Sequence, residues 1–126
     1  GLIDRVAVTG EDRRLAPRMA LSLALAVNEL VTNAVKYGAL SQPGGRVEIG
    51  WRTVPDARNG EPELEWTWRE SGGPAVTSPS HRGFGSVLIE RVLAADFGGT
   101  VTTDFAPAGL LVTLRVPAAS MPPNGA

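Results

Sequence analysis

A stretch of the chain rich in Ala, Leu and Val carries four polar residues whose types could do chemistry: Glu29, Asn33, Lys36 and Tyr37. Their spacing would place them on one face of a helix. There Asn33 could offer an amide oxygen to Mg²⁺, Glu29 could orient or deprotonate a water or hydroxyl, and Lys36 could pair with phosphate. Taken alone, a solvated helix face is the better interpretation, because such residues are common on amphipathic helices.

A second group follows a predicted strand. Glu70 stands at the end of the strand, and Gly72, Gly73 and Pro74 come after it. A carboxylate in this place could accept a hydrogen bond from an exocyclic amine, and the glycines would let a flat base lie against the backbone. A strand that simply ends in a turn explains the same residues, since glycines before a proline often form turns.

A third group, Gly83-Phe84-Gly85-Ser86, precedes a predicted helix. The N–H groups at a helix start favour an anion, and glycine lets phosphate oxygens approach the main chain. The group is neither a Rossmann fingerprint nor a P-loop, because the third glycine and the G-K-[ST] motif are missing. The alternative is an N-cap by Ser86 with a flexible hinge.

The first group depends on a long predicted helix. No Gly or Pro occurs from Arg18 to Tyr37, Pro17 suits the first turn, and Gly38 is well placed to end the helix. The apolar residues that recur at helical spacing and should face a core are Leu23, Val27, Leu30 and Ala34.

Alternating and turn-rich segments predict the other elements. Strands are expected at 5–8, 47–54, 64–68, 100–105 and 110–116, a loop at 71–82 and a second helix at 86–97. The second and third strands should pair as a β-hairpin, because Asn59-Gly60 lies between them. This order predicts an α+β two-layer sandwich with a mostly antiparallel sheet.

Composition narrows the class of protein. The 126 residues carry a formal net charge of −1, which does not suit a nucleic-acid binder. The chain lacks cysteine and has one histidine, His81, so zinc–thiolate and multi-histidine sites are excluded. No apolar run is long enough to cross a bilayer, so we expect no membrane contact and a cytoplasmic location. We expect a piece of a longer protein, with one domain at 1–117 and a frayed tail at 118–126.

Together the three groups resemble the N, G1 and G2 boxes of the GHKL ATPase superfamily, above all those of the HWE histidine kinases. Residues 28–41 resemble the N box, residues 68–74 the W-x-E-x-G-G-P of the G1 box, and residues 83–91 the G2 box. The resemblance covers about residues 5–117 and is specific as a set, although each piece alone is weak. It implies a GHKL (Bergerat) sandwich, with helices on one face of a mixed sheet, and implies ATP and Mg²⁺ as cofactors.

The resemblance also implies roles for the helix residues. Asn33 would bind the Mg²⁺ that bridges the ATP phosphates, and Glu29 would lie near the γ-phosphate. Lys36 and Tyr37 would approach the phosphates and the ribose.

The other two groups would complete the same site. Glu70 would take the place of the aspartate that reads the adenine amine in other histidine kinases, with Gly72 and Gly73 beside the base. Residues 71–82 would cover the ATP. The phosphate side would be formed by Gly83, Phe84, Gly85 and Ser86.

The implied function is that of a protein-histidine kinase. The domain would donate the γ-phosphoryl group to a histidine on a separate dimerisation domain, from which it would pass to a response regulator. We expect a homodimeric parent and a monomeric excised domain. Two features depart from the family: Asn28 replaces the N-box histidine, and His81, in the predicted loop, lacks the helix of a phosphoacceptor.

Two alternatives remain open. The domain could be a nucleotide-binding switch that regulates a protein partner with little transfer, and Asn28 favours this reading. A stand-alone serine kinase of the anti-sigma type is a third possibility, weakened by the W-x-E box.

Overall fold

The computed structural model describes residues 1–55, 58–75 and 84–123. The elements within these ranges are η1 (Leu2–Arg5), β1 (Val6–Thr9), α1 (Pro17–Lys36), η2 (Ala39–Ser41), β2 (Arg46–Pro55), β3 (Pro62–Ser71), α2 (Phe84–Phe97), β4 (Thr100–Ala106), β5 (Gly109–Pro117) and η4 (Ala118–Ser120). Apart from the short 3-10 helices η1, η2 and η4, this is the predicted order of helices and strands.

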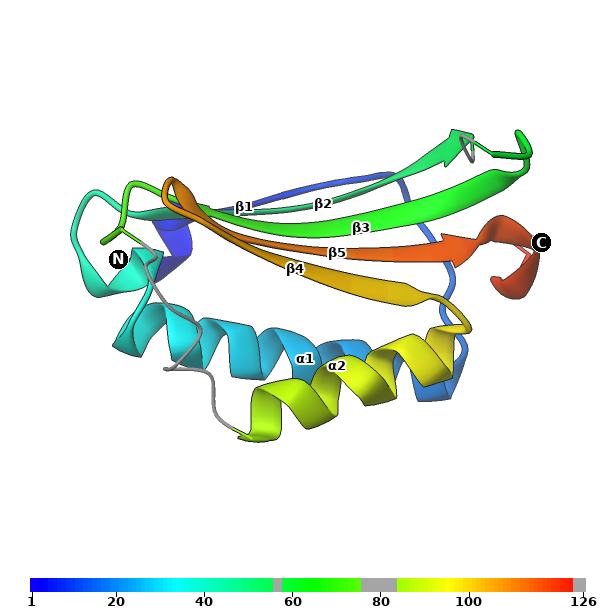
Figure 1. Ribbon diagram of the computed structural model, residues 1–126, viewed down its shortest axis with the longest axis horizontal. Coiled ribbons are helices and arrows are strands. Elements are labelled where there is room, and N and C mark those ends of the chain that lie inside the picture. The colour runs from blue at the N-terminus through cyan, green and yellow to red at the C-terminus, as the bar shows by residue number, and fades with distance from the viewer. Residues whose placement is uncertain (56–57, 76–83, 124–126) are drawn as a thin grey trace.

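The strands form one sheet in the order β1-β2-β3-β5-β4. β1 runs parallel to β2, and every other pair of neighbours is antiparallel. Figure 1 shows α1 and α2 side by side on one face of this sheet, while no described element covers the other face. The prediction of an α+β two-layer sandwich, with a mixed sheet and helices on one face, is therefore confirmed.

The core lies between the helices and the β2–β3 hairpin. Ile49 pairs with Trp68 and Trp51 with Trp66, so the apolar side chains of both strands lie on the helix-covered face. Trp68 is fully buried, with 0% of its surface exposed. Truncating a buried aromatic residue to alanine typically costs about 3–5 kcal/mol.

The long helix α1 is bounded as its sequence predicts. It begins at Pro17, whose fixed φ suits a first turn, and ends at Lys36. Gly38 donates its N–H to the carbonyls of Asn33 at 3.2 Å and Ala34 at 3.1 Å, which satisfies the last turn. The predicted apolar stripe packs on the core, with Ala34 buried and the others partly buried: Leu23, Val27 and Leu30.

Most boundaries agree with expectation to within two residues, but β3 and the C-terminal segment differ more. β3 has ten residues where five were predicted, because its polar ends also pair with β2 as far as Pro55 opposite Pro62. The tail differs as well: residues 118–120 form η4, and the side chain of Met121 is buried in the core. Residues 118–121 thus fold back onto the domain, with Met121 in the core, while residues 124–126 lie outside the described ranges.

Candidate functional site

The polar group on α1 occupies the C-terminal half of the helix. Glu29 and Asn33 are half-buried, Lys36 is exposed, and Tyr37 is 48% exposed. The carbonyl of Asn33 accepts hydrogen bonds from the N–H groups of Tyr37 at 2.8 Å and Gly38 at 3.2 Å, so Asn33 stands in the last turn. These side chains therefore lie along the border between core and solvent, where a ligand at the end of α1 could reach them.

Glu70 lies directly against this end of α1. Its side chain is buried, and its Oε1 accepts a hydrogen bond from the N–H of Ala39 at 3.0 Å. Its Oε2 accepts a hydrogen bond from Nε1 of Trp68 at 2.9 Å. A Cβ on Gly38 would lie 2.3 Å from Oε1, so the carboxylate occupies space that only a glycine leaves. The structure thus places Glu70 against the residues that directly follow the first group on the chain, Gly38 and Ala39.

The glycines after Glu70 have a packing role. Gly72 has a φ of +72°, and a Cβ there would lie 2.6 Å from the carbonyl oxygen of Gly44. A Cβ on Gly73 would lie 2.4 Å from the Cα of Ala39. Both positions therefore need glycine for close contact with the segment after α1. This requirement is separate from the predicted contact with a base.

Ala39 takes part in three of these close contacts, although nothing in the amino-acid sequence indicated a role for it. Its backbone N–H binds Glu70, its Cα faces Gly73, and its carbonyl oxygen would lie 1.6 Å from a Cβ on Gly45. A backbone donor has no residue type to mark it. Trp68, by contrast, belongs to the W-x-E pattern, yet its indole was not expected to bind Glu70.

The third group lies at the start of α2. The helix begins at Phe84, two residues earlier than predicted, so Gly85 and Ser86 fall in its first turn. Nε of Arg18, near the start of α1, lies 3.5 Å from Oδ1 of Asp96, near the end of α2. The two helices are therefore antiparallel (Figure 1), and the start of α2 lies toward the C-terminal end of α1. The described residues of the third group, 84–86, thus lie on the side of the helix pair where α1 ends.

Part of the predicted site falls outside the described residues. Gly83 and His81 belong to residues 76–83, as does most of the predicted covering loop. The described part of that loop, residues 71–75, continues directly from β3.

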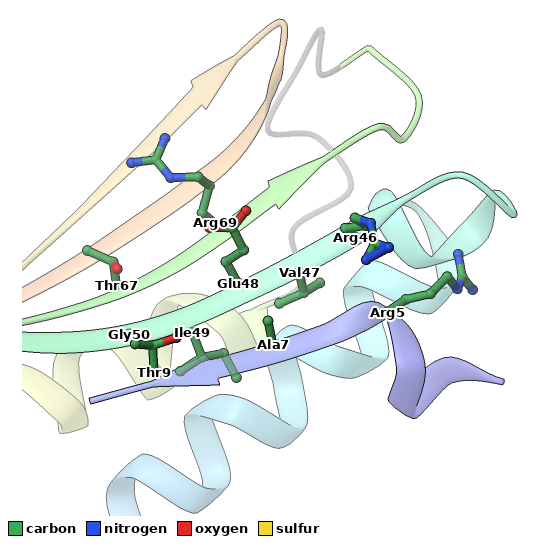
Figure 2. Close-up of a pocket in the computed structure, with 10 residues that line it drawn as sticks. All are labelled: Arg5, Ala7, Thr9, Arg46, Val47, Glu48, Ile49, Gly50, Thr67 and Arg69. Atoms are coloured by element: carbon green, nitrogen blue, oxygen red, sulfur yellow. The ribbon is translucent and has the colours of Figure 1, made fainter. Parts of the chain in front are cut away.

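A shallow groove of about 210 Å³ lies on the opposite, uncovered face of the sheet. Its lining includes Arg46, Glu48 and Gly50 from β2 and Arg69 from β3 (Figure 2). Arg5, at one end, donates hydrogen bonds to the carbonyls of Leu40, Gln42 and Gly45, and so holds the turn before β2. Of the predicted site residues that the structure describes, none lines this groove.

Metal clusters and membrane-spanning helices are both absent from the described ranges. No group of three or more His, Asp or Glu side chains there could hold a metal ion. No helix there is both long and apolar enough to cross a bilayer. The C-terminal half of α1 carries one amide, of Asn33, and one carboxyl group, of Glu29. This set suits Mg²⁺, which binds few protein ligands and keeps several waters.

Comparison of sequences finds relatives among sensor kinases. The chain is 40% identical over 113 residues to the blue-light-activated histidine kinase of Brucella anthropi, covering 90% of this chain and 23% of that protein. It is 40% identical over 114 residues to the protein of the same name from Brucella abortus, with the same coverage. The chain thus spans less than a quarter of these relatives. No protein-family model matches it.

Solved structures share the fold. The histidine kinase domain of the blue-light-activated kinase EL346 from Erythrobacter litoralis superposes with a TM-score of 0.65 at 20% identity, covering 92% of this chain and 55% of that one. The catalytic domain of the histidine kinase ThkA, in a nucleotide-free form, gives a TM-score of 0.60 at 18% identity, covering 90% and 78%. Fold and sequence comparisons agree: the chain has the fold of histidine kinase catalytic domains and is similar in sequence to part of the blue-light-activated histidine kinases.

Proposed function

We propose that this domain binds ATP with Mg²⁺ and, in the parent protein, donates the γ-phosphoryl group to a histidine on a separate dimerisation domain. The bond between the γ-phosphorus and the bridging oxygen breaks, a bond to an imidazole nitrogen forms, and ADP leaves. The observation that carries the proposal is the meeting of Glu70 with the end of α1, beside Asn33, Lys36 and Tyr37. The sequence relatives named as histidine kinases support it.

Each residue of α1 has a role in this proposal. Asn33 would bind the Mg²⁺ through its amide oxygen, and Glu29 would act near the γ-phosphate. Lys36 and Tyr37, both exposed, would bind the phosphates and the ribose. A Mg²⁺ ion held there would supply charge neutralisation at the phosphate oxygens, and the residues of the chain would mainly position the reactants.

Glu70 would read the amine of adenine, with Gly72 and Gly73 beside the base. A carboxylate offers about four lone-pair positions, and Trp68 and Ala39 use two of them. Acceptor capacity therefore remains for an amine. On the phosphate side, the start of α2 with Gly83, Phe84, Gly85 and Ser86 would supply main-chain N–H groups.

The parent protein would complete the reaction. We propose a homodimeric, cytoplasmic kinase of the HWE group, whose phosphate passes to a response regulator. The second candidate, a nucleotide-binding switch without efficient transfer, keeps support from Asn28, which stands where the HWE group has histidine. Asn28 is exposed, unlike the half-buried Glu29 and Asn33, so its identity should affect partners or transfer more than nucleotide binding.

A calorimetric titration of this chain with ATP, with and without Mg²⁺, tests the proposal. We expect binding that requires Mg²⁺ and is lost in Asn33→Ala. Asn28→Ala is the matched control, since it removes the same side chain from an exposed position of the same helix. Unchanged Mg²⁺-ATP affinity in Asn33→Ala would defeat the assignment. Measuring phosphoryl transfer from ATP to an added dimerisation domain then distinguishes a histidine kinase from a nucleotide-binding switch.

A further inference from the structure

We propose that Trp68 is the positioning residue that makes the site select a 6-amino purine over a 6-oxo purine, by holding the carboxylate of Glu70 through its indole N–H. This inference rests on the proposed nucleotide site and adds a determinant of specificity to it. It assigns Trp68, the tryptophan of the W-x-E pattern, a role in addition to packing in the core.

The indole has a fixed position. Trp68 is fully buried, and it pairs with Ile49 on β2 and Val112 on β5, so neighbouring strands flank it on both sides. Glu70 lies two residues further along β3, on the same face of the sheet. The 2.9 Å hydrogen bond from Nε1 to Oε2 therefore ties the carboxylate to a ring that cannot turn without opening the core.

The other oxygen of the carboxylate is held from the opposite direction. Oε1 accepts the 3.0 Å hydrogen bond from Ala39, and the absent side chain of Gly38 leaves the space that it occupies. With one donor on each oxygen, the carboxylate has a single orientation. Its unused lone pairs then point in fixed directions, and a third donor must approach along one of them.

This orientation has a chemical consequence for the base. An ionised carboxylate only accepts hydrogen bonds. The amine at position 6 of adenine donates one, whereas the carbonyl at position 6 of guanine presents a second acceptor and is repelled. A 6-oxo base would need a donor instead, and the N–H groups of Trp68 and Ala39 are both already donated to Glu70. Selectivity thus depends on the carboxylate staying in place.

The chain offers a matched control. Trp66 is also a buried tryptophan of β3 on the same face, paired with Trp51 and Leu114, and it lies four residues from Glu70. Trp68→Phe and Trp66→Phe remove the same volume from the same core, but the first also removes the indole donor to Glu70.

The test is to titrate the wild type and both variants with the Mg²⁺ complexes of ATP, GTP and inorganic triphosphate. We expect Trp68→Phe to lower the ratio of ATP to GTP affinity by about tenfold, the usual effect of losing one well-placed hydrogen bond to a charged group. Triphosphate affinity should be unchanged, and Trp66→Phe should keep the wild-type ratio. An unchanged ratio in Trp68→Phe would overturn the inference, as would an equal fall in Trp66→Phe. Failure of the wild type to bind ATP would instead overturn the proposed function.

A second measurement covers the case in which Trp68→Phe does not fold. In ¹⁵N-labelled wild-type chain, the indole N–H signals can be followed by NMR during titration. We expect the Trp68 signal, identified by its change in Glu70→Gln, to shift with a non-hydrolysable ATP analogue and to stay in place with inorganic triphosphate. A Trp68 signal that responds to neither, or equally to both, would overturn the inference.

Discussion

The buried hydroxyl of Ser22, on α1, donates a hydrogen bond to Oδ2 of Asp96, on α2. The other carboxylate oxygen of Asp96 lies 3.5 Å from Nε of Arg18, also on α1. Asp96 therefore joins the end of α2 to the start of α1. This link joins the two antiparallel helices at the end of the pair where α1 begins and α2 ends.

We predict that Asp96→Ala lowers the free energy of unfolding by about 1–3 kcal/mol, because it leaves the buried Ser22 hydroxyl without its acceptor. Arg18 should add little, since its side chain is 78% exposed. Urea unfolding followed by circular dichroism measures the change. Asp104→Ala, which removes an exposed aspartate from β4, is the control. Equal stability of the two variants would show that the Ser22–Asp96 bond contributes nothing.

Gly38→Ala is predicted to disturb Glu70 from the side of the helix. The new Cβ would lie 2.3 Å from Oε1, so the carboxylate or the backbone must shift, at a cost of about 1–3 kcal/mol. Calorimetry should show weaker binding of Mg²⁺-ATP as well as a lower urea midpoint. Gly44→Ala is the matched control, since its new Cβ would have 4.0 Å to the nearest atom. A stable Gly38→Ala that binds ATP normally would contradict this account.

Glu70→Ala should weaken Mg²⁺-ATP but not Mg²⁺-triphosphate, because only the base would lose its acceptor. The variant also strands two buried donors, of Trp68 and Ala39, and should lower stability by about 1–3 kcal/mol per unsatisfied group. Parallel titrations with both ligands, at a temperature where the variant is folded, compare the loss of affinity for ATP with the loss for triphosphate. Equal weakening of ATP and triphosphate would mean that Glu70 does not read the base.

Glu65 and Arg52 form part of an ion-pair network on the uncovered face of the sheet, and they should contribute unequally to the stability of the domain. Glu65 is 9% exposed and accepts hydrogen bonds from Nη2 of Arg115 at 2.6 Å and Nε of Arg52 at 3.3 Å. Glu65→Ala should cost about 1–3 kcal/mol, because it breaks charge-assisted bonds of a largely buried carboxylate. Arg52→Ala should cost about 0–1 kcal/mol, since that side chain is 73% exposed. Urea midpoints that rank the two in the opposite order would refute this ranking.

The C-terminal segment should matter for stability as far as Met121. A chain ending at Pro117 loses that buried side chain, and we expect it to be less stable by about 2–5 kcal/mol. A chain ending at Met121 is the control and should unfold near the wild-type midpoint. Thermal unfolding of the two truncated chains compares them. Identical midpoints would show that Met121 does not anchor the segment.

Local patterns were enough to predict the elements. Apolar residues at helical spacing placed α1 to within a residue at its ends, and alternation around Asn59-Gly60 placed the β2–β3 hairpin. Both signals arise from neighbours along the chain, so they need no knowledge of the fold. The same patterns predicted too short a strand for β3, because the ends of this strand are polar and are extended only through their pairing with β2.

The sequence by itself predicted the two-layer architecture and marked three groups of polar and glycine residues as a candidate site, because residue type and periodicity are local properties. Only the tertiary structure decided that the carboxylate of Glu70 meets the N–H of Ala39, 31 residues away, and that Met121 closes the core. Such contacts depend on strand order, on close approach at Gly38 and Gly73, and on a backbone donor that every residue type but proline carries. No spacing along the chain encodes them, since they arise only when separate elements pack together.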